Sequence, residues 1–357
     1  MSRKKAIVSG AFGQDAKFLA DLLFANSVDV ILVYRYSSVP LAERAKYYDL
    51  NKVFHMECLD ITDPTGVNEV VNKYKPDYIF NMAAQSHVGQ SFKDSQVTFQ
   101  VNALGVLNWL EAIRRLSPET RFLQASTSEM WGSNYSVEDR IECKNSNGEN
   151  FILAEGGKFQ NEETPFSPNS PYAIAKLAAH NLCRVYRESY GIFACTSICM
   201  NHESEFRGEN FVTRKITKWI AKNVLNIRMG RPLVKLKLGN IDAVRDWSHA
   251  EDIVEGMYKI INHDIPDDFV LCSEQGRSVR DFLSFAFSYV GVNNWEDYVE
   301  IDPALYRPCE VEFLQGRSTK ARDTLDWVPK IPFDKLVERM VDSDSKEDTY
   351  EKSRRIL

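Results

Sequence analysis

Short apolar runs alternate with longer segments of helical periodicity through the first half of the chain. Six such runs predict strands: Ala6–Ser9, Val30–Tyr34, Val53–Cys58, Tyr78–Asn81, Arg121–Ser126 and Phe193–Ile198. Between them, segments such as Gln14–Ala25 and Thr65–Lys73 place apolar residues at helical spacing. This alternation is typical of the α/β class, with a doubly wound parallel sheet covered by helices on both faces.

The pattern becomes less regular from about Asn201. Two short strands, Val234–Leu238 and Asp268–Cys272, are expected there among helices. We interpret residues 1–200 as the sheet domain and residues 201–341 as a smaller α/β domain built on the carboxyl edge of the sheet. The charged tail, residues 342–357, is expected to fray or to form a solvated helix.

The composition is that of a globular protein, with 44% hydrophobic and 26% charged residues. The net charge of −6 argues against a protein that binds nucleic acid through bulk charge. No stretch approaches the roughly 20 apolar residues of a membrane helix, and the N-terminal apolar strand is too short for the core of a signal peptide. We therefore expect a cytoplasmic protein without a membrane partner.

Cysteine and histidine usage indicates neither a disulfide framework nor a metal site. The seven cysteines are odd in number and form no C-x-x-C pair, which favours free thiols in a reducing compartment. The six histidines are scattered and form no H-x-x-x-H motif. We expect no metal.

The residues that follow the first strand have the pattern of a dinucleotide-binding turn. Gly10 suits the tight turn, Gly13 lets the backbone approach a pyrophosphate, and Ala16 is the third small residue, where the helix packs near the strand. The phosphates would lie at the helix N-terminus, where free N–H groups favour anions. A glycine pair also occurs in ordinary strand–helix turns, but the α/β pattern behind it favours the dinucleotide.

The tip of the second strand indicates which dinucleotide is bound. NAD sites usually carry Asp or Glu there, whereas this tip has no carboxylate and reads Arg35, Tyr36, Ser37, Ser38. A guanidinium and hydroxyl groups suit a 2′-phosphate, although Arg35 could also be a surface arginine beside a loop. The pattern favours NADP over NAD.

Candidate catalytic residues follow the fifth strand. Ser126–Glu129 reads S-T-S-E at the carboxyl edge, where ligands bind in such sheets. Tyr172 and Lys176 are four residues apart on the next predicted helix and therefore share a face. A tyrosine with a pKa of about 10 is a poor base at neutral pH, but an adjacent ammonium and an oxidised nicotinamide would lower that pKa. Chance explains a lone Y-x-x-x-K motif, but not one combined with the glycine turn and Thr127.

Several sequence blocks resemble the GDP-mannose 4,6-dehydratase family of extended short-chain dehydrogenases/reductases. In chain order they are Gly10–Asp15, Asn81–Val88, Gln124–Glu129, Ser170–Lys176, Asn201–Lys215, Leu238–Trp247 and Arg307–Gly316. The last three blocks are specific to this family, whereas the earlier ones belong to the whole superfamily. The resemblance implies a Rossmann-like fold, an NADP cofactor and a homo-oligomer, a tetramer with the Arg35–Ser38 loop near a subunit interface.

The resemblance also implies roles for individual residues. The catalytic positions match Thr127, Glu129, Tyr172 and Lys176. The cofactor contacts match Gly10, Ala11, Phe12, Gly13, Gln14, Asp15, Arg35, Tyr36, Ser37, Ser38, Asp60, Ile61, Met82, Ala83, Ala84, Gln85, Ser86, Lys176, His202 and Arg207. The contacts with the GDP-sugar match Asn210, Lys215, Arg245, Arg307 and Glu310.

The implied chemistry begins with oxidation at C4 of the sugar. Tyr172 removes the C4 hydroxyl proton, Thr127 orients that hydroxyl, and hydride passes to NADP⁺. The new ketone acidifies the C5 proton, which Glu129 takes before it protonates the departing C6 oxygen. Hydride then returns to C6, and GDP-mannose becomes GDP-4-keto-6-deoxymannose.

The chain departs from the family pattern at several points. Arg35-Tyr36 stands where the family has paired arginines, and Val97 replaces a tyrosine that contacts NADP. Glu205-Phe206 replaces a Pro-Arg pair ahead of Arg207. The stretch 133–161 is longer than in the family, and we expect it beside the sugar pocket.

Other functions stay open from the sequence. A 4,6-dehydratase of another GDP-sugar, such as a GDP-heptose, would use the same residues. A nucleotide-sugar 4-epimerase or decarboxylase on this fold is disfavoured by Glu129, because a 4-epimerase needs no acid-base group at C5 and C6. A catalytically silent NADP-binding scaffold is disfavoured by the four catalytic side chains together.

Overall fold

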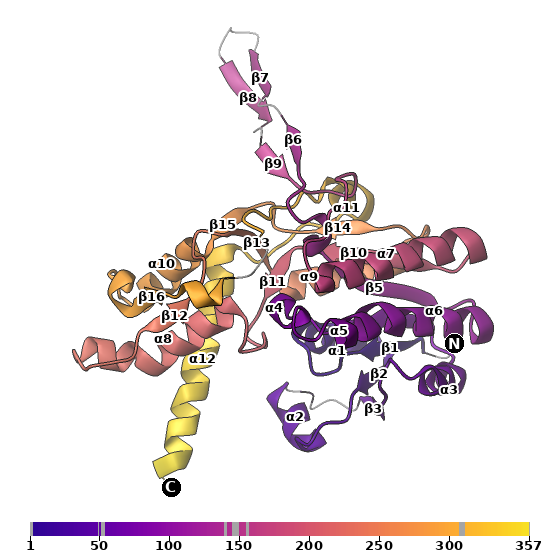
Figure 1. Cartoon of the computed structure of the whole chain (residues 1–357). Helices are drawn as coiled ribbons and strands as arrows, with labels where there is room; N and C mark the ends of the chain where they lie inside the picture. Colours follow the sequence, from indigo (N-terminus) through magenta and orange to yellow (C-terminus); the bar gives the residue numbers. More distant parts are fainter. Residues whose placement is uncertain are drawn as a thin grey trace.

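The central sheet has seven parallel strands (Figure 1). The computed structural model describes residues 3–48, 50, 54–138, 141–144, 150–154, 157–306 and 311–356, with the backbone alone at 138, 141–144, 150–154 and 349–356. From one edge of the sheet to the other, the strands are β3 (His55–Cys58), β2 (Asp29–Tyr34), β1 (Lys5–Ser9), β4 (Tyr78–Asn81), β5 (Arg121–Thr127), β10 (Ala194–Cys199) and β14 (Phe269–Leu271).

Helices cover both faces of this sheet. On one face α1 (Gln14–Ala25) packs against α9 (Ala250–Asn262), with α11 (Thr319–Leu325) beside α9. The other face carries α3 (Pro64–Tyr74), α6 (Gly105–Leu116) and α7 (Pro171–Tyr190). Because both faces are covered, every residue of the inner strands β4 and β10 and of the edge strand β14 is buried. This confirms the predicted α/β class.

The large sheet also takes up a strand from the second half of the chain. The run Asp268–Cys272 is expected from the sequence in the smaller domain, but β14 pairs with β10 and forms the seventh strand. Asp268 fixes this edge, because its carboxylate accepts two hydrogen bonds from Arg187 of α7, at 3.1 and 2.8 Å. The pair therefore anchors the C-terminal end of α7 to the sheet.

A second layer of structure lies beside the carboxyl edge of the sheet (Figure 1). It contains the helices α8 (Val212–Arg228), α10 (Val279–Tyr289) and α12 (Phe333–Ile356). Its strands are β11 (Asn201–Glu203), β13 (Val244–His249) and β15 (Gly276–Ser278) in one small sheet, and β12 (Leu236–Leu238) and β16 (Val299–Ile301) in another. Ile216, Trp247, Phe282 and Leu336 belong to its core.

The charged tail is not a separate, fully solvated segment. It continues α12 without a break, and Asp344 within it is only 2% exposed. Asp344 pairs with the equally buried Arg214 of α8 at 2.8 Å, so this carboxylate faces the interior. The expectation that residues 342–357 fray or form a solvated helix is therefore wrong at Asp344.

The long stretch between β5 and α7 forms an arm that projects from the body (Figure 1). Its ribbons pair β6 (Ser136–Glu138) with β9 (Gly157–Phe159) and β7 (Ile141–Lys144) with β8 (Asn150–Ala154). At its base, the backbone of Gln160 accepts from Arg317 and donates to Gln315. These strands pair with each other and not with the large sheet, and the place of this stretch beside the sugar pocket stays a prediction.

Short elements complete the described chain. They are α2 (Leu41–Tyr47), α4 (Val88–Ser91), α5 (Ser95–Phe99), the π-helical turn η1 (Gln100–Leu104) and the 3₁₀ turns η2 (Ser128–Trp131), η3 (Trp295–Tyr298) and η4 (Pro303–Leu305). Within the described ranges no helix is long and apolar enough to cross a membrane.

Candidate active site

The predicted cofactor residues lie along the carboxyl edge of neighbouring strands. Residues 10–15 follow β1, residues 35–38 follow β2, residues 60–61 follow β3 and residues 82–86 follow β4. These four strands are adjacent in the order β3-β2-β1-β4, so their loops meet at one edge. The structure thus brings together segments that the sequence separates.

The glycine turn is the tightest point of this edge. Gly10 has a φ of +78°, and a Cβ atom there would lie 3.0 Å from the nitrogen of Ala83. Only glycine combines this backbone conformation with so close an approach. The amide of Gly13 donates to the carbonyl of Gly10 at 2.9 Å, and α1 begins at the next residue. The first N–H groups of α1 are therefore available to an anion.

The loop after β4 is held by the side chain of Asn102, a residue that the sequence analysis did not identify. Asn102 accepts a hydrogen bond from the amide of Gln85 at 2.8 Å and donates one to its carbonyl at 2.9 Å. Asn102 is 1% exposed and lies in the π-helical turn η1. Apolar periodicity carries no signal for a π turn, so sequence analysis could not place this side chain.

The residues expected near the adenosine end are more exposed. Arg35 to Ser38 form an exposed loop after β2, and Tyr36 is 81% exposed. Arg44 of α2, also missed by the sequence, donates to the carbonyl of Arg35 at 3.3 Å. Its guanidinium lies 3.9 Å from the ring centre of Phe12, which is a cation–π contact. Two arginines therefore border this part of the edge.

Two further predicted cofactor residues, Asp60 and Ile61, mainly contact neighbouring protein residues. Asp60 accepts hydrogen bonds from the amide and hydroxyl of Thr62, at 3.0 and 2.8 Å. Ile61 is 4% exposed and lies so close to Gly105 that a Cβ atom there would be 2.7 Å from its Cδ1. A cofactor would contact Asp60 and Ile61 at the surface of the turn that follows β3.

Asp15, His202 and Arg207 form a charged group beside the glycine turn. The Nε2 atom of His202 lies 3.1 Å from Oδ2 of Asp15, and its Nδ1 lies 3.0 Å from the carbonyl of Met200. Burial raises the pKa of Asp15, but the charge and hydrogen bond of His202 and the charge of Arg207 outweigh it, so the net shift is downward. The Oδ1 atom of Asp15 is buried without a hydrogen-bond partner among the described residues. The site therefore offers a hydrogen-bond acceptor to a cofactor.

The four predicted catalytic residues come together at the end of β5 and the start of α7. Thr127 ends β5, and its hydroxyl accepts from the amide of Glu129 at 3.3 Å. Tyr172, in the first turn of α7, is hydrogen-bonded to the side chain of Thr127. Lys176 donates to the carbonyl of Ala125 at 2.9 Å, and its Nζ lies 5.9 Å from the centre of the Tyr172 ring.

The residues expected to hold the GDP-sugar lie farther out, in the smaller layer. Asn210 and Lys215 are exposed around the start of α8. Arg245 is 7% exposed on β13 and donates to the carbonyl of Val244 at 2.8 Å. Arg307 and Glu310 lie outside the described residues.

Comparison with known proteins supplies the family. The family model described as GDP-mannose 4,6 dehydratase matches residues 7–150 and 153–340. GDP-mannose 4,6 dehydratase 2 of Arabidopsis thaliana is 40% identical over 352 residues, which cover 96% of this chain and 87% of that protein. The human GDP-mannose 4,6 dehydratase is 37% identical over 366 residues, which cover 96% and 91%. The chain belongs to the GDP-mannose 4,6-dehydratase family.

Solved structures of low sequence identity share the fold. The dTDP-glucose 4,6-dehydratase of Bacillus anthracis in complex with NAD has a TM-score of 0.77 at 18% identity, covering 97% of this chain and 98% of that one. RMD of Pseudomonas aeruginosa complexed with NADPH has a TM-score of 0.72 at 22% identity, covering 96% and 99%. The Rossmann-like fold is thereby confirmed, and NAD and NADPH both occur on it.

Burial shifts the pKa values of the tyrosine and the lysine of this family motif in opposite directions. It raises the pKa of Tyr172 above its usual value, and the charge of Glu129 adds to the rise, while the Thr127 hydrogen bond and Arg207 oppose it. It lowers the pKa of Lys176 to about 8, against the charge of Asp15. At neutral pH the lysine is still an ammonium, and the tyrosine needs added positive charge to act as a base.

We expect Lys176 in the cofactor-free protein to titrate at a pH of about 8, because burial disfavours its charged form. The measurement is the pH dependence of the lysine ¹³Cε shifts by NMR, with Lys176→Met to assign the signal. A value at the ordinary lysine pKa of about 10.4 would contradict the burial described here.

Proposed function

We propose that this protein converts GDP-mannose to GDP-4-keto-6-deoxymannose and that Thr127, Glu129, Tyr172 and Lys176 carry the reaction. The observation on which this depends is the half-buried Glu129, two residues beyond Thr127, whose charge acts on Tyr172. An enzyme that only oxidised and reduced C4 would need Tyr172, Thr127 and Lys176 alone. Glu129 adds an acid-base group at the same place.

In the first stage Tyr172 accepts the proton of the C4 hydroxyl, which Thr127 orients by hydrogen bonding. Lys176 and Arg207 supply the positive charge that favours the tyrosinate. When bound, NADP would supply the hydride acceptor for C4 and the hydride donor for C6. Asp15, His202 and the N-terminus of α1 would hold the cofactor beside these groups.

In the second stage Glu129 acts on C5 and C6. The C4 ketone makes the C5 proton acidic, and the carboxylate of Glu129 takes it. The same group, now protonated, gives the proton to the departing C6 oxygen, which leaves as water. When hydride returns to C6, C5 takes up one proton, which matches the proton that Tyr172 removed from the C4 hydroxyl, so Glu129 and Tyr172 both regain their starting states within each turnover. Asn210, Lys215, Arg245, Arg307 and Glu310 would hold the GDP-sugar. The lysine and the two arginines among them suit its diphosphate, since cationic side chains pair well with phosphates.

The Glu129→Gln variant should complete the first oxidation and then stall, because glutamine keeps the size of glutamate but cannot take a proton. Turnover should fall by roughly 10²- to 10⁴-fold, the usual effect of losing a general acid-base residue. Nicotinamide absorbance in a single-turnover mixture should show reduced cofactor accumulating.

The matched comparison is Tyr172→Phe, which should block the first step and leave the cofactor oxidised. Nearly normal turnover of Glu129→Gln with GDP-mannose would contradict both the role of Glu129 and the dehydratase function. If the unmodified protein converted another GDP-sugar at a normal rate and did not convert GDP-mannose, it would be a dehydratase of that other sugar.

We further propose NADP as the cofactor. The loop from Arg35 to Ser38 has no carboxylate for a ribose hydroxyl, and Arg44 adds a second guanidinium near the carbonyl of Arg35. Two planar cations suit the two negative charges of a 2′-phosphate.

Arg35→Ala should therefore weaken NADP⁺ binding by about tenfold or more, the value of one charged hydrogen bond, and leave NAD⁺ binding nearly unchanged. Titration calorimetry with both cofactors measures the difference. Lys46→Ala, which removes an exposed charge from the same helix as Arg44, is the control. Equal losses for both cofactors would mean that Arg35 does not contact the 2′-phosphate.

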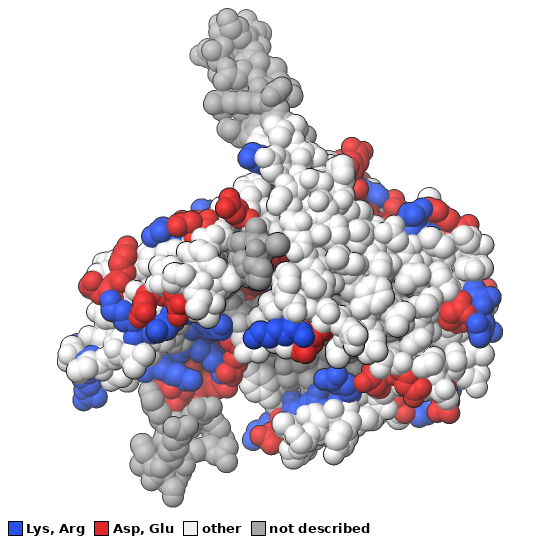
Figure 2. All heavy atoms as spheres, viewed as in Figure 1, with Lys and Arg blue, Asp and Glu red and all other residues white. Residues whose placement is uncertain are grey.

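We also propose a homo-oligomer, a tetramer. Figure 2 shows that the face over α5, α6 and α7 carries few charged side chains away from its borders. Val97, Phe99, Leu104 and Ile174 lie on these helices and on η1, each between 42% and 50% exposed. Apolar side chains gathered in this way are typical of subunit contacts.

Light scattering at micromolar concentration should give a mass that is a multiple of the 40.9 kDa chain. Val97→Asp, which adds a charge to this face, should reduce that mass. A monomer in the unmodified protein would contradict the oligomer.

A further inference from the structure

A short loop between β11 and α8 carries Arg207, the cationic residue whose charge reaches both Asp15 and Tyr172. We name residues 203–208 the Arg207 loop. The side chain of Arg207 is held by Glu203 at 3.1 Å and by the ring of Phe211, whose centre lies 3.5 Å from the guanidinium carbon. Its position therefore depends on how the loop backbone is fixed.

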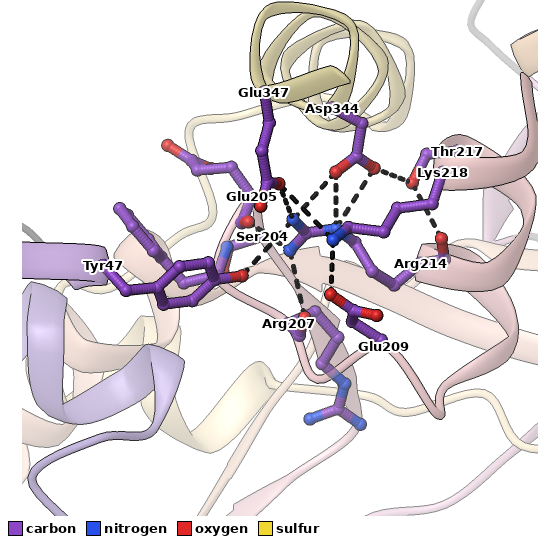
Figure 3. Close-up of polar contacts among 11 residues, drawn as sticks. Tyr47, Ser204, Glu205, Arg207, Glu209, Arg214, Thr217, Lys218, Asp344 and Glu347 are labelled. Atoms are coloured by element: carbon purple, nitrogen blue, oxygen red, sulfur yellow. Dashed lines mark hydrogen bonds and ion pairs between the residues drawn. The ribbon is translucent and has the colours of Figure 1, made fainter. Parts of the chain in front are cut away.

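The backbone of this loop is fixed by a buried arginine that the catalytic scheme does not use. Arg214 of α8 is 1% exposed, and its Nη1 donates to the carbonyl of Glu205 and, at 3.0 Å, to that of Arg207 (Figure 3). The other side of the same guanidinium faces Asp344, with Nε to Oδ1 at 2.8 Å and Nη2 to Oδ1 at 2.8 Å. One planar group thus links two loop carbonyls to a carboxylate of α12.

The C-terminal helix makes a second contact with the loop. The carboxylate of Glu205 accepts from Arg339 of α12 at 3.1 Å and lies 3.2 Å from Nε2 of the buried His249. Glu205 is the residue that departs from the family's proline. Its neighbour Phe206, the other departure, stacks on Tyr48 with ring centres 5.9 Å apart. Glu205 and Phe206, two of the departures from the family pattern, therefore both contact elements outside the loop.

The Arg207 loop is also linked to the first residue of α1, beside the expected cofactor site. The hydroxyl of Ser204 donates to the side chain of Gln14 at 2.8 Å, and the side-chain amide of Gln14 donates to the carbonyl of His202 at 2.9 Å. Gln14 is the first residue of α1, directly after the glycine turn. A displacement of the loop would therefore move the residues that border the dinucleotide site.

We propose that Arg214 is a positioning residue for Arg207 and that α12, through Asp344 and Arg339, is the support that holds the Arg207 loop in its binding position. This rests on the proposed function and on the NADP contact that the family resemblance implies for Arg207. Lysine cannot replace Arg214, because one ammonium has no planar fork to reach two carbonyls and a carboxylate together.

The test compares Arg214→Lys with the unmodified protein for NADP⁺ binding by titration calorimetry, alone and in an Arg207→Ala background. Lysine keeps a charge opposite Asp344, so thermal unfolding should show a folded protein. Arg214→Lys should weaken NADP⁺ binding by about tenfold, a coupling typical of one hydrogen-bond network. In the Arg207→Ala background the same substitution should have almost no further effect, since Arg214 acts through Arg207.

Glu347→Gln is the matched control. Glu347 contacts Arg214 at 3.3 Å and Lys218 at 3.4 Å but forms no hydrogen bond or ion pair with the described residues 203–208, so NADP⁺ affinity should be unchanged. If Arg214→Lys does not fold, Glu205→Gln serves instead: it weakens the contacts with Arg339 and His249, and its smaller loss of affinity should also vanish in the Arg207→Ala background.

Two results would overturn different statements. The positioning role would be wrong if Arg214→Lys, or Glu205→Gln in its place, weakened NADP⁺ binding equally with and without Arg207. It would also be wrong if that substitution left NADP⁺ affinity unchanged while Arg207→Ala weakened it. If Arg207→Ala alone left NADP⁺ affinity unchanged, the proposed cofactor role of Arg207 would fail, and the inference with it.

Discussion

A buried chain of hydrogen bonds across three strands fixes the geometry on which the site depends. The hydroxyl of Ser9 donates to Asn81 at 2.5 Å, and Asn81 donates to Gln124 at 2.7 Å. The three residues are direct partners in the register of β1, β4 and β5, and none is more than 1% exposed. A slip of one residue would leave these polar groups unpaired in the interior, at a cost of about 1–3 kcal/mol each. These hydrogen bonds therefore fix the positions of the glycine turn, the loop after β4 and Thr127 relative to one another. The amide of Ala83 adds to them by donating to the hydroxyl of Ser9 at 3.2 Å.

That framework brings charged and titratable groups into a buried site, which explains their shifted pKa values. Tyr172 and Lys176 occupy one face of α7 because they are four residues apart. The Ser170 cap starts the helix directly before them, with the amide of Ala173 donating to the serine hydroxyl at 3.1 Å. Burial pushes the tyrosine away from ionisation and the lysine toward neutrality. A bound, positively charged ring would favour the tyrosinate, so the base becomes effective only when the cofactor is in place. This arrangement links proton removal to cofactor binding.

Local patterns predicted much of the fold and of the catalytic group. Gln14–Ala25 and Tyr78–Asn81 match α1 and β4, because helical periodicity and a continuous apolar run each arise from burial of nearby residues. The proposed catalytic residues come from a motif on one helix and one strand end. Contacts between distant segments could not be read in this way: β14 pairs into the large sheet, and Asp344 meets Arg214 across 130 residues. A row of charges predicts a solvated face, and nothing local shows which of them turns inward.

In the Arg207 loop, side-chain pairs hold the position at which the family pattern that this sequence resembles has a proline. Where the family has proline, the ring itself restricts φ and lowers the conformational freedom of the unfolded chain. Glutamate provides no such restriction, and here the order comes from pairs with His249 and Arg339. Although burial raises the pKa of Glu205, these partners lower it to about 2, so the carboxylate stays ionised at neutral pH and the pairs persist. The constraint has thus moved from a covalent ring to side chains on β13 and α12. A change in the C-terminal helix can therefore reach the cofactor edge in this chain by a route that a proline at position 205 would not provide.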